Sequence, residues 1–228
     1  MIFTDGLRGS WHLLGAAAAL MALSAAPTFG NDVRILDGDT IKIGETTYRI
    51  FGIDAPEAGQ TCARGSGRNW NCGTEAIHAL ERLVSAGPVN CDGQGLDDYG
   101  RTLAICHVGE IDIGAQMVAQ GMAWAFRRYS PIYNEIEDQA RARDVGIWQA
   151  ETEPAWELRA RRWEAAEQEA PDGCPIKGNI SRDGERIYHT PWSHWYSRTK
   201  INEAAGERWF CDELEALEAG WRAPLWGG

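Results

Sequence analysis

The chain has 228 residues, of which 44% are hydrophobic and 24% charged, and this composition excludes a mostly disordered or collagen-like protein. Its 33 acidic residues outnumber its 22 Lys and Arg residues, so the formal net charge is −11. This charge disfavours a protein that captures nucleic acid through bulk positive charge. Chemistry on a polyanion would have to come from a few placed cations or from a metal.

The N-terminal segment is typical of a secretory signal. One strong cation, Arg8, precedes an uninterrupted run of apolar and small residues from Leu13 to Ala26. That run is shorter than the roughly 20 residues that a membrane-spanning helix needs. We therefore expect residues 1–30 to be a signal peptide on a protein that is periplasmic or secreted, with no stable membrane span. A buried helix or an uncleaved anchor is the alternative.

Six cysteines suit this export route, because thiols oxidise outside the cytosol. The order of the cysteines alone leaves many pairings open. Proximity along the chain favours three disulfides, which are Cys62–Cys72, Cys91–Cys106 and Cys174–Cys211. A zinc site formed by the last pair with His189 and His194 is the alternative, and the absence of CxxC spacing argues against it.

Alternating apolar and polar residues predict short antiparallel strands after the signal. They cover residues 33–36, 39–43 and 46–53, with a turn at Gly44-Glu45. Thr74 can cap a helix that runs to about Ala86.

Two further strands are expected over residues 88–92 and 101–108, separated by a turn rich in Gly and Asp. A short helix over residues 112–120 ends before Gly121, and Ser130-Pro131 opens a third helix that ends near Gly146. The pattern predicts an α+β domain over residues 31–150, a five-stranded OB-type β-barrel with three helices.

The rest of the chain divides into two expected parts. Residues 151–172 read as a charged helical linker, most simply a solvated or docking helix. Residues 173–228 read as a small Cys- and Trp-rich C-terminal domain, which a disulfide would help to stabilise. Its aromatic residues could stack on bases but are more simply its core, and its histidines are more simply structural than catalytic. The aromatic residues concerned are Trp192, Trp195, Tyr196 and Trp209.

Four short motifs in the first half stand out. They are Asp37-Gly38-Asp39-Thr40, Arg49-x4-Asp54-x-Pro56-Glu57, Asp97-Asp98-Tyr99-Gly100-Arg101 and Gly146-Ile147-Trp148. Each alone is most simply a turn, a loop or the end of a hairpin. Together they supply the groups that phosphodiester hydrolysis needs.

Each group has a chemical reason to be present. Asp39 and Asp54 could hold a hard cation through oxygen, and Glu57 could act as general base on a water. Arg49 and Arg101 could grip phosphate oxygens and neutralise the charge that grows in the transition state.

In order, spacing and identity, these motifs resemble the staphylococcal nuclease (thermonuclease) family over residues 33–149. The resemblance implies an OB-type barrel and calcium-dependent cleavage of DNA and RNA that leaves 3′-phosphates. By motif position, Asp39 and Asp54 match the calcium-binding aspartates and Glu57 the glutamate that activates water. Arg49 and Arg101 match the phosphate-binding arginines.

The resemblance also implies substrate contacts and shows departures. Tyr99 matches a tyrosine near the nucleotide phosphate, and Tyr129 one near the base. Ala55 replaces a threonine whose backbone carbonyl binds the metal, and alanine keeps that carbonyl. Asp98 and Arg127 replace a lysine and a tyrosine of the type enzyme, which together with the acidic charge predicts weak, salt-sensitive substrate capture.

The sequence thus predicts an exported, calcium-dependent nuclease acting on single-stranded or frayed DNA or RNA. One alternative is a nuclease-like module that binds nucleic acid or a protein without turnover. Another is a calcium-stabilised scaffold for the C-terminal domain. The oligomeric state is open, with a monomer as the expectation.

Overall fold

The structure is a computed structural model that describes residue 1 and residues 32–226. The apolar run from Leu13 to Ala26, on which the expected signal peptide rests, lies outside the described residues. Within the described ranges, no helix combines the length and the apolar character that a membrane crossing requires.

Five strands in the first half of the chain form the larger sheet, in the order β1-β2-β3-β8-β7. Their bounds are β1 Val33–Asp37, β2 Thr40–Ile43, β3 Thr46–Ile50, β7 Val89–Leu96 and β8 Thr102–Val108. Neighbouring strands are antiparallel except β3 and β8, which are parallel. A short strand, β9 (Ile111–Asp112), also pairs with β8. The five strands expected from the sequence are therefore present, but the third ends at Ile50 instead of residue 53 and β7 continues beyond the expected residue 92 to Leu96.

The sheet does not close into the expected barrel. Among the described residues no ladder joins β1 to β7, the strands at the two ends of the order. Instead, the Trp226 N–H donates to the Ile35 carbonyl at 2.9 Å, so a segment near the C-terminus takes an edge group of β1. The register of β7 also shifts between Gly93 and Gly95, and such irregularities bend a strand. The closed barrel is thus corrected to an open, OB-like sheet.

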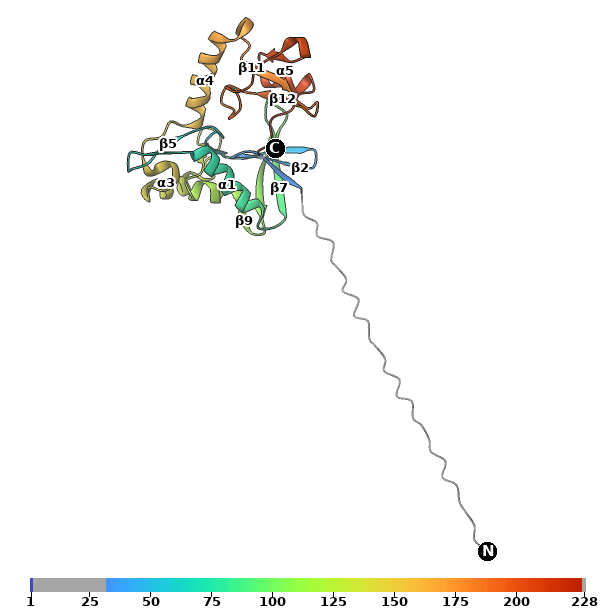
Figure 1. Ribbon diagram of the computed structural model, residues 1–228. Coiled ribbons are helices and arrows are strands. Elements are labelled where there is room, and N and C mark those ends of the chain that lie inside the picture. The colour runs from blue at the N-terminus through green and yellow to red at the C-terminus, as the bar shows by residue number, and fades with distance from the viewer. Residues whose placement is uncertain (2–31, 227–228) are drawn as a thin grey trace.

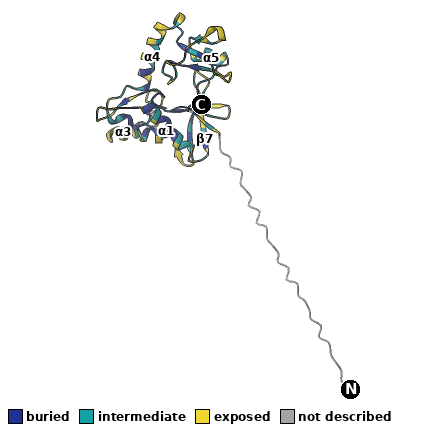
Figure 2. Ribbon diagram, in the orientation of Figure 1, coloured by how far each residue is buried: buried dark blue, intermediate teal, exposed yellow. Residues whose placement is uncertain are grey.

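Three helices pack on this sheet, and their bounds are α1 Cys72–Val84, α2 Ile113–Ala119 and α3 Asn134–Ala142. In Figure 1, α1 and α3 lie on the side of the sheet away from the C-terminal part of the chain. Figure 2 shows buried residues where the helices meet the strands. Fully or almost fully buried core side chains there include Ile41, Ile50, Ile77, Leu80 and Met117. Burial of this apolar surface holds the helices against the sheet.

The first helix begins earlier than the sequence suggested. Thr74, the expected cap, lies inside α1, which begins at Cys72 with Asn71 in the N-cap position. The disulfide to Cys62 ties the first residue of the helix to the preceding loop. The Thr74 hydroxyl instead donates to the Ala58 carbonyl at 3.5 Å.

The third helix begins at Asn134, three residues after the expected opening at Pro131. The motif at Gly146 forms a 3-10 turn, Gly146–Gln149, that packs backbone to backbone on Gly121. A Cβ on Gly146 would lie 2.0 Å from the Gly121 carbonyl oxygen, and the Ile147 N–H donates to that oxygen at 2.9 Å. This motif therefore supports the fold, because only glycine permits the close approach.

The second half of the chain begins with helix α4 (Ala155–Glu169). A smaller sheet of order β12-β11-β13 and a short helix follow, with bounds β11 Ile176–Ile180, β12 Arg186–His189, β13 Arg208–Phe210 and α5 Glu213–Glu218. We call residues 173–226 the C-terminal block. Its own core consists of Ile176, Tyr188, Phe210, Ala216 and Trp221.

The remaining elements are short. They are β4 Ile53–Asp54, β5 Cys62–Ala63, β6 Asn69–Trp70, β10 Trp124–Ala125 and 3-10 turns at Pro171–Gly173 and Glu203–Ala205. β4 pairs with β10, and β5 pairs with β6.

The three disulfides join the pairs that proximity favoured, Cys62–Cys72, Cys91–Cys106 and Cys174–Cys211. Cys174 and Cys211 are thus bonded to each other and are not zinc ligands. His189 is buried and has its Nε2 2.8 Å from the Asn179 Oδ1, as a structural histidine would.

Candidate active site

Two aspartates lie buried where short segments of the first half meet. Asp39 occupies the turn between β1 and β2, and Asp54 ends β4, directly opposite Trp124 of β10. The side chain of Asp39 is 6% exposed and that of Asp54 is not exposed at all. Carboxylates are rarely buried to this extent without a cationic partner.

Arg49 on β3 supplies that partner for both aspartates. Its Nη1 donates to Asp39 Oδ1 and its Nη2 to Asp54 Oδ1, each at 2.9 Å. Burial opposes the charge of Asp39, but Arg49 and the Thr40 hydroxyl outweigh it, and the pKa of Asp39 falls below its usual value. The motif residues thus form one contact network across three separate segments.

Glu57 lies next to this network with a second carboxyl group, Asp37, beside it. Burial together with the charge of Asp37 raises the pKa of Glu57 well above its usual value. Burial and the charge of Asp39 raise the pKa of Asp37 to about 6. A carboxylate whose pKa is raised is a stronger base when ionised, which suits a group that accepts a proton from water.

Arg101 enters from the β7–β8 hairpin. Its backbone N–H donates to Asp97 Oδ1 at 2.9 Å and its Nε to Asp97 Oδ2 at 2.6 Å, so Asp97 both closes the turn and fixes the side chain. Gly100 has a φ of +75°, which a turn of this shape requires. The Arg101 guanidinium lies 5.3 Å from the centroid of the Tyr99 ring. The four-residue spacing from Asp97 to Arg101 thus lets the aspartate close the turn and hold the arginine side chain.

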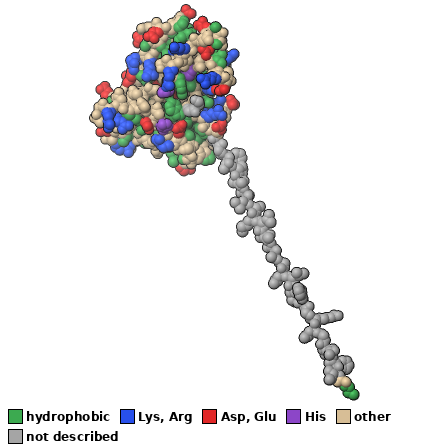
Figure 3. All heavy atoms as spheres, viewed as in Figure 1, with side chains coloured by type: hydrophobic (Ala, Val, Ile, Leu, Met, Phe, Trp, Pro, Cys, Tyr) green, Lys and Arg blue, Asp and Glu red, His purple; other side chains and the backbone are tan. Residues whose placement is uncertain are grey.

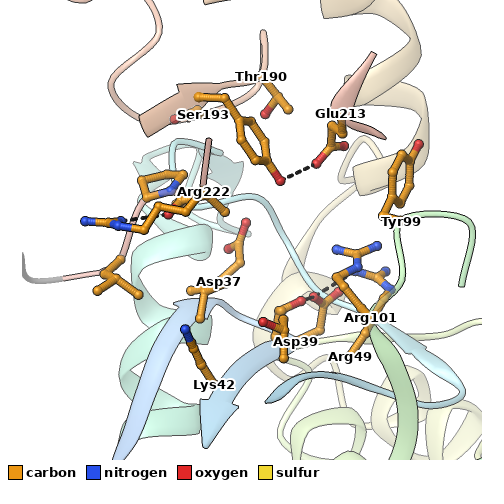
Figure 4. Close-up of a pocket in the computed structure, with 18 of the residues that line it drawn as sticks. Asp37, Asp39, Lys42, Arg49, Tyr99, Arg101, Thr190, Ser193, Glu213 and Arg222 are labelled. Atoms are coloured by element: carbon orange, nitrogen blue, oxygen red, sulfur yellow. Dashed lines mark hydrogen bonds and ion pairs between the residues drawn. The ribbon is translucent and has the colours of Figure 1, made fainter. Parts of the chain in front are cut away.

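These groups line a common cavity of about 1080 Å³. Figure 4 shows Asp39, Arg49 and Arg101 on its lower wall and residues of the C-terminal block, including Glu213, on the facing wall. The structure therefore brings together Asp39, Arg49, Ala55, Glu57, Tyr99 and Arg101 around one space, with Asp54 held behind it by Arg49.

Tyr129 is placed differently from the other expected residues. It does not line this cavity, is 65% exposed and packs on Phe126 with 4.6 Å between ring centroids. Phe126 in turn stacks on Trp156 of α4. The expected base-binding tyrosine therefore belongs to an exposed aromatic cluster outside the cavity. Arg127, on the same segment, donates to Glu137 at 2.5 Å and so supports the fold.

Sequence reasoning missed Arg159 of helix α4. Its Nη2 donates to Asp54 Oδ2 at 2.8 Å, and its Nη1 donates to Asp54 Oδ1 at 3.1 Å and to Glu57 Oε1 at 2.5 Å. The helix expected to be a solvated or docking segment thus inserts a cation among the expected metal ligand, the expected base and Arg49. The position of Arg159 in the site depends on how α4 docks on the first half of the chain.

A signal for this insertion was present in the helix pattern. The positions of α4 that face the protein repeat at i, i+3, i+4, i+7 and i+8, the spacing of a buried helical stripe. They are Ala155, Leu158, Arg159, Arg162 and Trp163. Two arginines in a stripe that should be apolar indicate charged groups on the facing surface.

The C-terminal block also brings a carboxyl group to the cavity. The Tyr188 hydroxyl donates to Glu213 Oε2 at 3.0 Å, and Figure 4 shows Glu213 across the cavity from Arg49 and Arg101. Burial raises the pKa of Glu213, while the charge of Arg101 opposes this rise. Glu213, like Arg159, was not expected from any motif.

Asp39, Asp54 and the Ala55 carbonyl offer the oxygen ligands that calcium prefers, so the donor set fits this metal. Within the described residues, no three His, Cys, Asp or Glu side chains are already grouped as a metal site. Oxygens of both aspartates accept hydrogen bonds from Arg49, and Asp54 also accepts them from Arg159.

The face of the molecule seen in Figure 3 carries both signs of charge, with Lys and Arg side chains interspersed with Asp and Glu.

The chain is similar to known proteins in both halves. The family model described as "Staphylococcal nuclease homologue" matches residues 47–150, and the ArfC family model matches residues 162–223. A succinoglycan biosynthesis protein, ExoI, of Rhizobium meliloti is 30% identical over 161 residues, which are 67% of this chain and 84% of that protein. A micrococcal nuclease of Shigella flexneri is 34% identical over 158 residues, 60% and 84% of the two chains. An uncharacterized endonuclease of Haemophilus influenzae is 34% identical over 139 residues, 58% and 72%.

Proposed function

Because the chain belongs to the staphylococcal nuclease family, we propose that it is a calcium-dependent phosphodiesterase that hydrolyses DNA or RNA and leaves 3′-phosphate ends. One observation carries this proposal. Arg49 joins Asp39 to Asp54, and the cavity lined by Asp39 and Arg49, with Asp54 behind it, is also lined by Glu57 and Arg101. Metal ligands, a base and two guanidiniums are the complete set of groups that this hydrolysis uses.

Each residue has one role in this proposal. Asp39, Asp54 and the Ala55 carbonyl hold calcium, which polarises the phosphate when bound. Glu57 takes a proton from water as the water oxygen bonds to phosphorus and the bond from phosphorus to the 5′-oxygen breaks; the 5′-oxygen takes a proton from solvent water and leaves as a hydroxyl. Arg49 and Arg101 bind the non-bridging oxygens, where negative charge grows.

The substrate proposed is single-stranded or frayed nucleic acid. The C-terminal block forms the wall opposite the catalytic residues, so the phosphate must enter a covered cavity rather than an open face. A single strand can thread its backbone into such a space, whereas a paired duplex is far wider. Tyr99 would lie beside the phosphate, and Tyr129 would offer a ring for a base outside the cavity.

The compartment proposed is the periplasm or the exterior of the cell. Three disulfides support it, because such bonds persist in oxidising compartments. We propose a monomer that acts on nucleic acid.

The test is cleavage of labelled single-stranded DNA and RNA with calcium or with a chelator. Wild type is compared with Glu57→Gln and with Glu110→Gln, a control at an exposed turn. We expect calcium-dependent cleavage that only Glu57→Gln abolishes. A folded, calcium-binding protein that cleaves nothing would favour the alternative of a nuclease-like binding module.

A further inference from the structure

The part of the chain after residue 154 places an opposite charge at each end of the active site. Helix α4 places the Arg159 guanidinium on the acidic end, at Asp54 and Glu57. Helix α5 places the Glu213 carboxyl group opposite the basic end, across the cavity from Arg49 and Arg101. A cation thus lies where a metal would bind, and a carboxyl group faces the arginines where a phosphate would bind.

We propose that Arg159 is an internal competitor of calcium, and that metal binding requires this side chain to leave Asp54. The proposal rests on the proposed function only in taking Asp39 and Asp54 as metal ligands. In the absence of calcium, helix α4 and the C-terminal block then obstruct the active site, and calcium binding displaces the Arg159 side chain from it.

The contacts of Asp54 make the competition strict. Both of its oxygens accept hydrogen bonds from Arg159, and Oδ1 accepts a further one from Arg49. The Asp54 side chain has no exposed surface. A metal ion therefore cannot reach an Asp54 oxygen while the Arg159 guanidinium remains in place.

The same side chain also restrains the proposed base. Arg159 Nη1 donates to Glu57 Oε1, and the two side chains are only 23% and 8% exposed. A carboxylate in a charge-assisted hydrogen bond of this kind is a weaker proton acceptor. One side chain thus blocks the metal position and the base together.

The competition is reversible because the buried carboxylates need a nearby positive charge, which either the Arg159 guanidinium or calcium can supply. Without a metal, Asp39, Asp54 and Glu57 bring several negative charges into a buried space, where an unpaired charge is costly. Arg49 and Arg159 offset them, and calcium would offset them in place of Arg159.

Helix α4 is anchored so that displacement moves more than one side chain. Ala155 and Leu158 are buried, Arg162 donates to the Trp192 carbonyl at 3.2 Å, and Trp163 packs on Trp192. The Arg159 bonds to Asp54 and Glu57 add to these anchors, so their loss should loosen α4 against the rest of the protein without releasing it.

The test measures calcium binding by calorimetry on the full mature chain, without substrate. Arg159→Gln is compared with wild type and with Arg161→Gln, a matched control whose partner is Glu153 on the surface. We expect calcium to bind Arg159→Gln at least about tenfold more tightly, because the fraction of molecules with free ligands no longer limits the apparent affinity. Arg161→Gln should bind as wild type does.

Amide hydrogen exchange supplies the second measurement. Adding calcium to wild type should speed exchange over residues 155–169, and this change also decides the matter if Arg159→Gln fails to fold. Arg159→Lys, whose ammonium lacks the planar fork, should bind calcium with intermediate affinity. Equal calcium affinity in wild type and Arg159→Gln, or unchanged exchange of α4 in wild type on calcium binding, would overturn the proposal.

These results are separable from the nuclease assay. Tighter calcium binding without any cleavage would support the competition and count against the proposed function. Cleavage with equal calcium affinities would do the reverse.

Discussion

The two halves of this chain build opposite walls of one cavity, but they encode their walls in different ways. The first half places its charged groups in short motifs at turns and strand ends, such as Asp97 and Arg101 within one hairpin. The second half contributes single residues of helices, Arg159 and Glu213, which belong to no motif. The arginines in the buried stripe of α4 indicate a charged facing surface but not which residues form it. A wall built from local turns is readable from sequence, whereas one built by docking is not.

The halves also differ in what holds them together. The first half has a large apolar core between its sheet and three helices. The C-terminal block has a small core around Ile176, Phe210 and Trp221, and a disulfide spans it. We therefore expect chemistry to be sensitive to substitutions in the first half and stability to substitutions in the second.

The largest expected effect concerns the catalytic wall. Arg101→Lys should lower turnover by about 10³-fold, because lysine cannot present a planar fork to the phosphate. Steady-state cleavage of a labelled single-stranded oligonucleotide measures it. Arg82→Lys, at the exposed end of α1, is the control and should cleave normally. Normal turnover by Arg101→Lys would contradict the expectation that substitutions on the first-half wall of the cavity affect catalysis.

Removal of the disulfide should show the dependence of the C-terminal block on its covalent link. The Cys174–Cys211 bond closes a loop with a sequence separation of 37. The double variant Cys174→Ser, Cys211→Ser should lose about 3 to 4 kcal/mol of stability, since the bond restricts the unfolded chain. Urea unfolding followed by tryptophan fluorescence measures this. A loss below about 1 kcal/mol would show that the small core suffices.

Acid should weaken the C-terminal block through His189. Burial and the charge of Lys177 lower the pKa of His189 to about 4, so the folded state favours the neutral ring. Its contribution to stability is present above the unfolded pKa near 6.5 and is lost as pH falls through the folded value, on the order of 3 kcal/mol. His189→Gln should flatten the pH dependence of unfolding between about pH 6.5 and 4. An unchanged profile would assign the acid sensitivity elsewhere.

The smallest effect is expected at the exposed side of α4. The Arg161 and Glu153 side chains are 62% and 37% exposed, and exposed ion pairs contribute less than about 1 kcal/mol. Arg161→Gln should leave the unfolding midpoint in urea almost unchanged. A large drop in the unfolding midpoint would mean that exposed contacts hold α4 more than its buried stripe does. Arg161→Gln would then no longer serve as a neutral control for Arg159→Gln.

Much of the first half could be predicted from its sequence because local rules decide it. Alternating residues located the first three strands, and a turn rich in Gly and Asp separated the two further ones. The short helix expected over residues 112–120 is present as α2, with Asp112 as its cap, accepting the Ala115 N–H at 3.0 Å. Thr74 failed as a cap because a disulfide and a loop contact, both tertiary, set the start of α1. Barrel closure failed for the same reason, since Trp226 bonds to the edge of β1 from the other end of the chain.

The sequence by itself determined which residues of the first half could carry chemistry, because Asp39, Arg49, Glu57 and Arg101 lie in motifs whose turns and strand pairings are local. Only the tertiary structure decided what faces them. Arg159 meets Glu57 across a separation of 102 residues. No short-range pattern specifies such a contact, since it depends on how an amphipathic helix docks and on the buried charge that it must neutralise.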